Sequence, residues 1–225
     1  MFERFSEQAL AAVDLARQEA ERAGHRYLGP EHLLLGVLAD GHNGAAQLLR
    51  ARGVELEAAR AALLGLARRG VVPTPRPSDA ELLGTLGVDL DAVRQRAEQA
   101  FGARAVGQAT WRVTRRRRWR GARVTWTPLC GPPFFAKRAL QLASEQAKGL
   151  GHGAVGPGHL LAGVLEEARE PAGRTRVPRR HRRITAHVGL PAGYQGAAGP
   201  LLAALGVDLD ALRDAVAAEL GGVGR

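Results

Sequence analysis

The sequence predicts an all-α protein, and composition is the first observation behind that prediction. Hydrophobic residues make up 45% of the 225 residues but aromatic residues only 4%, so the core is built mainly from alanine, leucine and valine. This mixture favours closely packed helices over sheets, which prefer β-branched and aromatic residues. No alternating strand pattern stands out along the chain. The length suits one large or two small domains.

Internal repeats are the second observation. Residues 16–38 align without gaps on residues 143–165, and a shorter unit occurs three times, at 48–66, 82–101 and 201–220. Repetition of this kind marks recurring supersecondary units. The predicted organisation is a first repeat at 1–66, partial repeat helices at 67–101, an Arg/Trp-rich linker at 102–133, and a second repeat at 134–220 that a basic loop interrupts at about 167–196.

Local patterns support helices within each unit. Apolar residues from Leu10 to Ala23 recur every three or four positions and predict a helix over about 6–23. Pro30 and Glu31 are typical of a helix start, where proline loses no needed hydrogen bond and a carboxylate meets the positive end of the helix dipole. The glycine-containing units "GVELEAAR", "GVDLDAVR" and "GVDLDALR" each indicate a helix stop, a turn and a new helix.

The positive charge of the chain is concentrated in two segments. Seven arginines lie in 110–126 and six in 174–184, and neither segment contains an acidic residue. Subtracting these thirteen charges from the net charge of +10 leaves about −3 for the rest of the chain. The helical repeats are therefore mildly acidic, and nucleic-acid binding through charge would fall on these two segments.

Several classes of protein are disfavoured by what the sequence lacks. A single cysteine, Cys130, allows no internal disulfide, and no apolar run approaches the length of a membrane span. The start of the sequence lacks the pattern of a signal peptide, so we expect a cytoplasmic protein with no membrane partner. Neither Lys137 nor Lys148 stands in a phosphate-binding G-x-x-x-x-G-K-[ST] motif. We expect no enzyme activity and no cofactor.

The sequence contains two histidine pairs that could supply metal ligands. His25 and His32 recur as His152 and His159, each pair seven residues apart. A metal site needs a third or fourth ligand, and the acidic neighbour Glu31 is replaced by glycine in the second copy. We therefore interpret these histidines as turn and helix-start residues packed within each repeat, and we predict no metal site.

The segments "MFERFSEQA", "GHRYLGPEHLLLGVL" and "LLRARGVELEAAR" resemble the N-terminal repeat (Clp R) domain of the Clp ATPases, of the Clp C type. The resemblance implies two pseudo-repeated four-helix motifs, joined here by a basic linker, in a stand-alone protein without the ATPase modules. It also implies a non-catalytic protein-binding function, as adaptor or competitor for the substrates or adaptors of a Clp chaperone-protease. The implied partners are a Clp ATPase, its substrates or its adaptors.

The resemblance further implies a site for phosphoarginine or hydrophobic peptides in the first repeat. Glu31 matches the acidic residue that holds the guanidinium, Ser6 takes the place of a threonine that helps to hold the phosphate, and Phe2 matches an aromatic of the peptide-contacting surface. In the second repeat Gly158 and Pro133 occupy the acidic and hydroxyl positions, so no second site is assigned. Apart from the resemblance, Glu31 and Ser6 read as residues that stabilise helix starts.

A nucleic-acid-associated protein is the alternative interpretation. Segment 110–126 interleaves its arginines with three tryptophans, which can stack on bases, and segment 174–184 adds further positive charge. No helix-turn-helix, zinc or RNA-binding signature accompanies them. A solvated connector is the competing reading of both segments. The candidate nucleic-acid contacts are Arg115, Arg116, Arg117, Arg118, Trp119 and Arg120.

Overall fold

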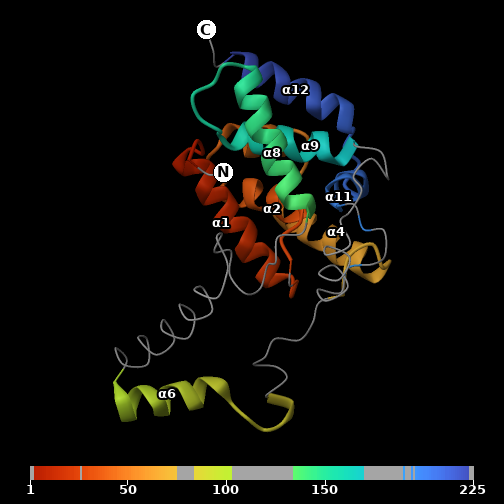
Figure 1. Ribbon diagram of the computed structural model, residues 1–225. Coiled ribbons are helices and arrows are strands. Elements are labelled where there is room, and N and C mark those ends of the chain that lie inside the picture. Colours follow the sequence, from red (N-terminus) through yellow and green to blue (C-terminus); the bar gives the residue numbers. More distant parts are fainter. Residues whose placement is uncertain are drawn as a thin grey trace. The chain divides into compact units, whose positions relative to one another are not determined.

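The computed structural model describes residues 3–25, 27–74, 84–102, 134–169, 190, 194 and 196–222. Within these residues every regular element is an α-helix, which confirms the predicted fold class (Figure 1). The chain divides into a larger unit, Met1–Pro75 with Cys130–Arg225, and a smaller unit, Arg76–Leu129. The helices of the larger unit are α1 (Glu7–Arg22), α2 (Pro30–Asp40), α3 (Gly44–Arg50), α4 (Leu56–Arg68), α8 (Phe134–Gly149), α9 (Pro157–Arg169), α11 (Ala198–Ala204) and α12 (Leu209–Gly222).

The two repeats build the larger unit in the same way. In the first repeat α1 packs along α2, and in the second α8 packs along α9. The two inner helices, α2 and α9, then pack against each other. In Figure 1, α1 and α8 lie in front of this inner pair. Leucines of α2 and α9 are completely buried, so the shared core is formed where the repeats meet.

A close helix crossing recurs at equivalent places in both repeats. A Cβ on Gly36 of α2 would lie 2.2 Å from the backbone oxygen of Ala12 in α1. A Cβ on Gly163 of α9 would lie 2.2 Å from the backbone oxygen of Ala139 in α8. Only glycine permits such an approach of two backbones. The repetition seen in the sequence is therefore a repetition of backbone packing.

The turns between the later helices follow the predicted glycine signals. Gly53 precedes α4 and Gly206 precedes α12, with φ angles of +77° and +73°. Glycine adopts this left-handed conformation without the steric cost that a side chain would bring. The pattern "GV" followed by acidic residues therefore marks the same turn in both repeats.

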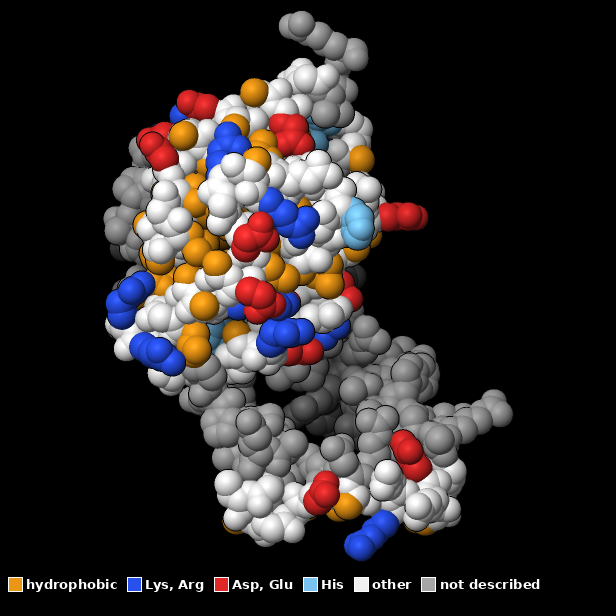
Figure 2. All heavy atoms as spheres, turned by 180° about the vertical axis from the view of Figure 1, so that it is seen from behind, with side chains coloured by type: hydrophobic (Ala, Val, Ile, Leu, Met, Phe, Trp, Pro, Cys, Tyr) orange, Lys and Arg blue, Asp and Glu red, His pale blue; other side chains and the backbone are white. Residues whose placement is uncertain are grey.

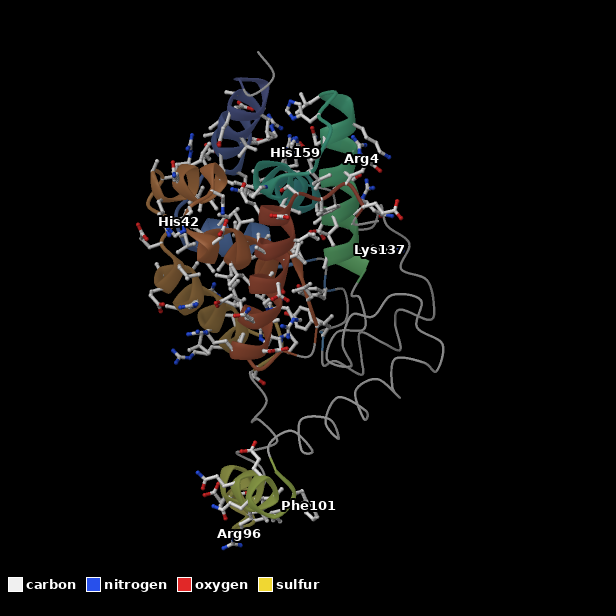
Figure 3. All side chains as sticks on the ribbon, turned by 90° about the vertical axis from the view of Figure 1, so that its left-hand side faces the viewer. Arg4, His42, Arg96, Phe101, Lys137 and His159 are labelled. Carbon is white, nitrogen blue, oxygen red and sulfur yellow. The ribbon has the colours of Figure 1, made fainter. Side chains whose placement is uncertain are left out.

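The beginning of the first repeat is tied to the second repeat. Phe5 forms an isolated parallel β-bridge with Val155, the Ser6 N–H donates to the Val155 carbonyl at 3.0 Å, and the Val155 N–H donates to the Arg4 carbonyl at 2.7 Å. The Arg4 guanidinium also donates to the His152 carbonyl at 2.8 Å, and Figure 3 shows Arg4 beside α8. These hydrogen bonds hold the start of α1 against the turn of the second repeat that contains His152 and Val155.

The smaller unit contributes one described helix, α6 (Leu90–Phe101). Its residues Val93 and Phe101 are 50% and 74% exposed, although their counterparts on α12, Leu212 and Leu220, are buried. Arg96 and Phe101 project from α6 in different directions (Figure 3). No helix among the described residues of either unit is long and apolar enough to cross a membrane.

Candidate functional site

Ser6 stands at the N-cap of α1, where the two repeats meet. Its hydroxyl oxygen accepts a hydrogen bond from the Ala9 N–H at 3.1 Å, and its backbone has the extended conformation of a cap residue. A capping hydroxyl satisfies one of the backbone donors that a helix leaves unpaired at its start. The side chain is only half-buried, so it also borders the surface beside the helix N-terminus.

Glu31 lies in the first turn of α2 and is completely buried. The Tyr194 hydroxyl lies 2.6 Å from Oε1 and 2.7 Å from Oε2, and it donates its proton to the carboxylate. The Ala197 N–H donates to Oε2 at 3.1 Å. A Cβ on Gly29 would lie 2.4 Å from Oε1, so the carboxylate packs closely against the backbone at Gly29. Glu31 of the first repeat is thus bound by a segment of the second.

Two tyrosines surround this carboxylate. Burial, followed by the charge of Glu31, raises the pKa of Tyr194 well above its ordinary value. The same two causes, in the same order, raise the pKa of Tyr27. Both hydroxyls therefore remain protonated across the physiological range. The Tyr27 ring meets the Tyr194 ring edge-on at 5.6 Å and stacks on His25 at 5.2 Å, which joins the Glu31 site to the histidine pair.

His25 and His32 form a directed chain of hydrogen bonds. The Gly29 N–H donates to Nδ1 of His32 at 2.9 Å, so a neutral His32 carries its proton on Nε2. That proton points to Nδ1 of His25 at 2.9 Å, and Nε2 of His25 then donates to the Pro73 carbonyl at 3.0 Å. Every ring nitrogen of the pair takes part in a hydrogen bond. These hydrogen bonds link the start of α2 to the segment after α4.

The second repeat contains the same histidine pair. The Gly156 N–H donates to Nδ1 of His159 at 3.0 Å, and Nε2 of His159 lies 2.9 Å from Nδ1 of His152. Within the described residues no group of three or more histidine, cysteine or acidic side chains is placed to hold a metal ion. In both repeats the pair ties a turn to the helix that follows it.

The environment of these histidines favours their neutral forms. Burial lowers the pKa of His32 to about 3. Burial, together with the neighbouring His32, lowers the pKa of His25 to about 4. Burial and His152 also lower the pKa of His159. Protonation would place a proton on a ring nitrogen that accepts a hydrogen bond. The series of hydrogen bonds therefore requires neutral rings.

The second repeat lacks the acidic centre. Gly158 takes the place of Glu31, and a Cβ there would lie 2.9 Å from Cδ2 of Leu220. Leu220 of α12 therefore covers the start of α9 with apolar atoms. Pro133, at the position that matches Ser6, lies outside the described residues.

The structure therefore describes two of the three predicted binding residues, Ser6 and Glu31, and Phe2 lies outside the described residues. Tyr194, which sequence reasoning missed, is the residue that contacts Glu31. It precedes α11 and falls within the predicted basic loop at about 167–196, where no local sequence pattern points to it. The candidate nucleic-acid contacts, Arg115, Arg116, Arg117, Arg118, Trp119 and Arg120, also lie outside the described residues, as does segment 174–184.

The described surface mixes charges of both signs. On the face shown in Figure 2, arginine and lysine side chains alternate with aspartate and glutamate side chains over the larger unit, with apolar side chains between them. Charged side chains of the larger unit also pair locally, as Arg17 does with Asp14 and Glu21. On this face no extended field of one sign marks a nucleic-acid groove.

Comparison with known proteins adds a family to these observations. Residues 4–80 match the Clp repeat (R) N-terminal domain family. Over 174 residues, or 77% of the chain, the sequence is 30% identical to the chloroplastic chaperone protein ClpC of Pisum sativum and to the ATP-dependent Clp protease ATP-binding subunit ClpA homolog of Guillardia theta. The chain spans only 13% and 15% of the lengths of these two relatives.

A solved structure is similar in fold. It is the N-terminal domain of the caseinolytic protease-associated chaperone ClpD from Arabidopsis thaliana, with a TM-score of 0.54. The likeness covers 98% of this chain and 96% of that chain at 18% sequence identity, so it bears on the fold alone.

Proposed function

Because the chain belongs to the Clp repeat (R) N-terminal domain family, we propose that it is a cytoplasmic, non-catalytic protein-binding module that serves a Clp chaperone-protease. It either presents clients as an adaptor or competes with the ATPase for substrates and adaptors. The observation that supports this most is the packing of both repeats into one helical unit around α2 and α9. The outer faces of the flanking helices are then available to partners.

The residues proposed to hold the ligand are Ser6, the buried Glu31 and Phe2. A phosphoarginine side chain would place its guanidinium on the Glu31 carboxylate and its phosphate near the Ser6 hydroxyl and the N-terminus of α1. In the folded chain the Tyr194 hydroxyl already donates to that carboxylate. The ligand must therefore displace Tyr194. Its apparent affinity equals the intrinsic affinity multiplied by the fraction of molecules in which Tyr194 has moved away.

Calorimetric titration of phosphoarginine into the full chain tests this site. We expect Glu31→Gln to weaken binding, because the carboxylate that pairs with the guanidinium is lost. We expect Tyr194→Phe to strengthen it, because the competing donor is removed while the ring remains. Asp14→Asn, at a side chain that is 63% exposed, is the control and leaves binding unchanged. A titration that Glu31→Gln does not alter excludes phosphoarginine recognition by this residue.

The wider proposal is tested by affinity purification of the tagged full chain from cells. A Clp ATPase subunit or a substrate of the Clp protease is expected among the captured proteins. Capture that contains neither, at low and moderate salt, contradicts the assignment to a Clp system.

Nucleic-acid association is the second candidate, favoured by the thirteen arginines in segments 110–126 and 174–184. This function predicts binding that weakens steeply as salt rises, because each phosphate contact releases counterions. Deleting 110–126 should abolish most of the binding in a gel-shift assay with duplex DNA or single-stranded RNA. Equal binding by the deleted chain contradicts it.

A further inference from the structure

The first repeat contains a pocket on the side of α4, separate from Ser6 and Glu31. Its volume is about 190 Å³, and it lies between the C-terminal end of α1, the turn at His25 and the helix α4. Leu35, Leu63 and Leu64 supply much of its apolar wall. Leu64 is 42% exposed, whereas Leu35 and Leu63 are buried, so the pocket opens to solvent past Leu64.

The rim of the pocket is charged and ordered. Arg60 of α4 donates from Nε to Oε2 of Glu19 at 2.8 Å and from Nη2 to Oε1 at 2.5 Å, which is the bidentate arrangement of a strong ion pair. Glu19 is buried, and these bonds fix both side chains. Arg22 is 66% exposed, and its Nε lies 3.9 Å from Glu19. The fourth titratable side chain of the lining is His25, and because burial lowers its pKa to about 4 it is neutral at pH 7.

The charges around the pocket are paired unequally. Arg60 is bound by Glu19 and also by Glu57, whereas Arg22 has only the 3.9 Å contact to Glu19. Arg22 is therefore the guanidinium with donors directed to solvent. An anionic group at the mouth of the pocket would therefore be attracted to Arg22.

The second repeat differs at residues that line this pocket. The aligned residue for Ala67 is the larger Leu220, whose side chain lies against Gly158, the counterpart of Glu31. Glu19 aligns with Gln146 and Arg22 with Gly149, so both rim charges are also lost there. Ala67, Glu19 and Arg22 are therefore all replaced in the second repeat, whereas Arg60 is matched there by Arg213.

We propose that this pocket binds one apolar side chain that stands next to a carboxylate on a partner polypeptide. A volume of about 190 Å³ suits a single side chain, since apolar cavities of about 150 Å³ hold benzene whereas sites for drug-sized molecules begin near 300 Å³. The apolar group enters past Leu64 and the carboxylate pairs with Arg22. The site does not involve Ser6 or Glu31, so it stands independently of the proposed phosphoarginine site.

The test is a nuclear magnetic resonance titration of the full chain, labelled at leucine methyl groups, with N-acetyl-leucine. We expect saturable shifts of the Leu63 and Leu64 methyl signals at millimolar concentrations. The uncharged N-acetyl-leucinamide should bind at least threefold more weakly, because it lacks the carboxylate. In Arg22→Ala the acid and the amide should bind equally.

Matched variants separate the pocket from general surface effects. Leu64→Asp should abolish the shifts, whereas Leu10→Asp should not, although both leucines are 42% exposed. Ala67→Leu copies the second repeat and should also abolish binding while the circular dichroism spectrum stays helical. Shifts that persist in Leu64→Asp overturn the proposal, as does equal binding of acid and amide by the wild-type chain. An absence of saturable shifts in the wild-type chain overturns it too, and is the result expected if a segment of the chain itself fills the pocket.

Discussion

In the first repeat the start of α2 carries the buried carboxylate of Glu31, whereas in the second the start of α9 carries Gly158 beneath the side chain of Leu220. Around these positions the two repeats agree closely. Both cross their first two helices at a glycine, and both tie a turn to the next helix through a pair of histidines.

The difference shows which parts of the motif are tied to its backbone. The glycine crossings and histidine pairs involve backbone atoms directly, so a change at either would move a helix. Glu31, Glu19 and Arg22 project from that frame, and the second repeat replaces all three without altering the helix order. Ligand chemistry can therefore be lost from one repeat while the fold is kept, and any chemical specificity should reside mainly in the first repeat.

The largest expected effect tests the shared frame. Gly36→Ala would place a Cβ 2.2 Å from the Ala12 backbone oxygen, which cannot move without shifting α1. We expect a loss of about 3 kcal/mol in the free energy of unfolding, measured by urea denaturation, at the upper end for overpacking. Gly163→Ala should cost a similar amount.

The control for these substitutions is Gly65→Ala. Gly65 lies within α4, and a Cβ there would meet nothing within 4 Å. Alanine is the better helix former, so this change should stabilise the chain by up to about 1 kcal/mol. A mild effect of Gly163→Ala beside a severe effect of Gly36→Ala would show that the two crossings are not equivalent.

Sequence reasoning succeeded where the signal is local and repeated. The periodic apolar residues predicted a helix over 6–23, and α1 spans Glu7–Arg22. Pro30 and Glu31 were expected at a helix start, and α2 begins at Pro30. The predicted interrupting loop began at about 167, whereas α9 continues to Arg169, so the helix overlaps the first residues of that segment.

The surroundings of Glu31 were not predictable in the same way. Tyr194 is 163 positions away and precedes α11 in a segment that the alignment of the repeats does not cover. Its contact with Glu31 depends on how one repeat packs against the other, and no local pattern encodes that distance. The pocket beside α4 was missed for a similar reason, since it needs the small Ala67 to lie opposite α1.

The second prediction concerns this contact between the repeats. Tyr194→Phe removes the hydroxyl that donates to Glu31 and leaves the buried carboxylate with the Ala197 N–H. We expect a loss of about 1.5–3 kcal/mol in unfolding free energy, as for a hydrogen bond to a charged group. A double-mutant cycle with Glu31→Gln should give a clear coupling energy, and additive effects of the two changes would argue that the bond contributes nothing.

The third prediction is a dependence of stability on pH. The pKa of His25 is lowered to about 4 and that of His32 to about 3, from an ordinary value of 6.5. The folded chain therefore binds fewer protons than the unfolded chain below pH 6.5, and stability is lost as the pH falls from about 6.5 toward 4. The loss between pH 7 and pH 6 should be on the order of 1 kcal/mol or less per histidine.

Urea unfolding at pH 7 and pH 6 measures this loss, and proton resonances of the imidazole rings assign it. The His32 signal should stay unchanged down to pH 5, while the less deeply buried His159 should begin to titrate earlier. A His32 signal that titrates with a midpoint near 6.5 would be incompatible with the neutral hydrogen-bonded chain.

The smallest expected effect is at Ser6, where capping and ligand binding can be separated. Ser6→Ala removes the acceptor of the Ala9 N–H and should cost about 1 kcal/mol, whereas Ser6→Thr keeps a capping hydroxyl and should change stability by only a few tenths of a kcal/mol. If the hydroxyl also holds a phosphate, Ser6→Ala should weaken phosphoarginine binding and Ser6→Thr should restore it. If stability falls in Ser6→Ala while the titration is unchanged, the hydroxyl acts as a helix cap alone. In that case the first repeat would differ from the second in ligand chemistry through Glu31 and the pocket beside α4, and not through Ser6.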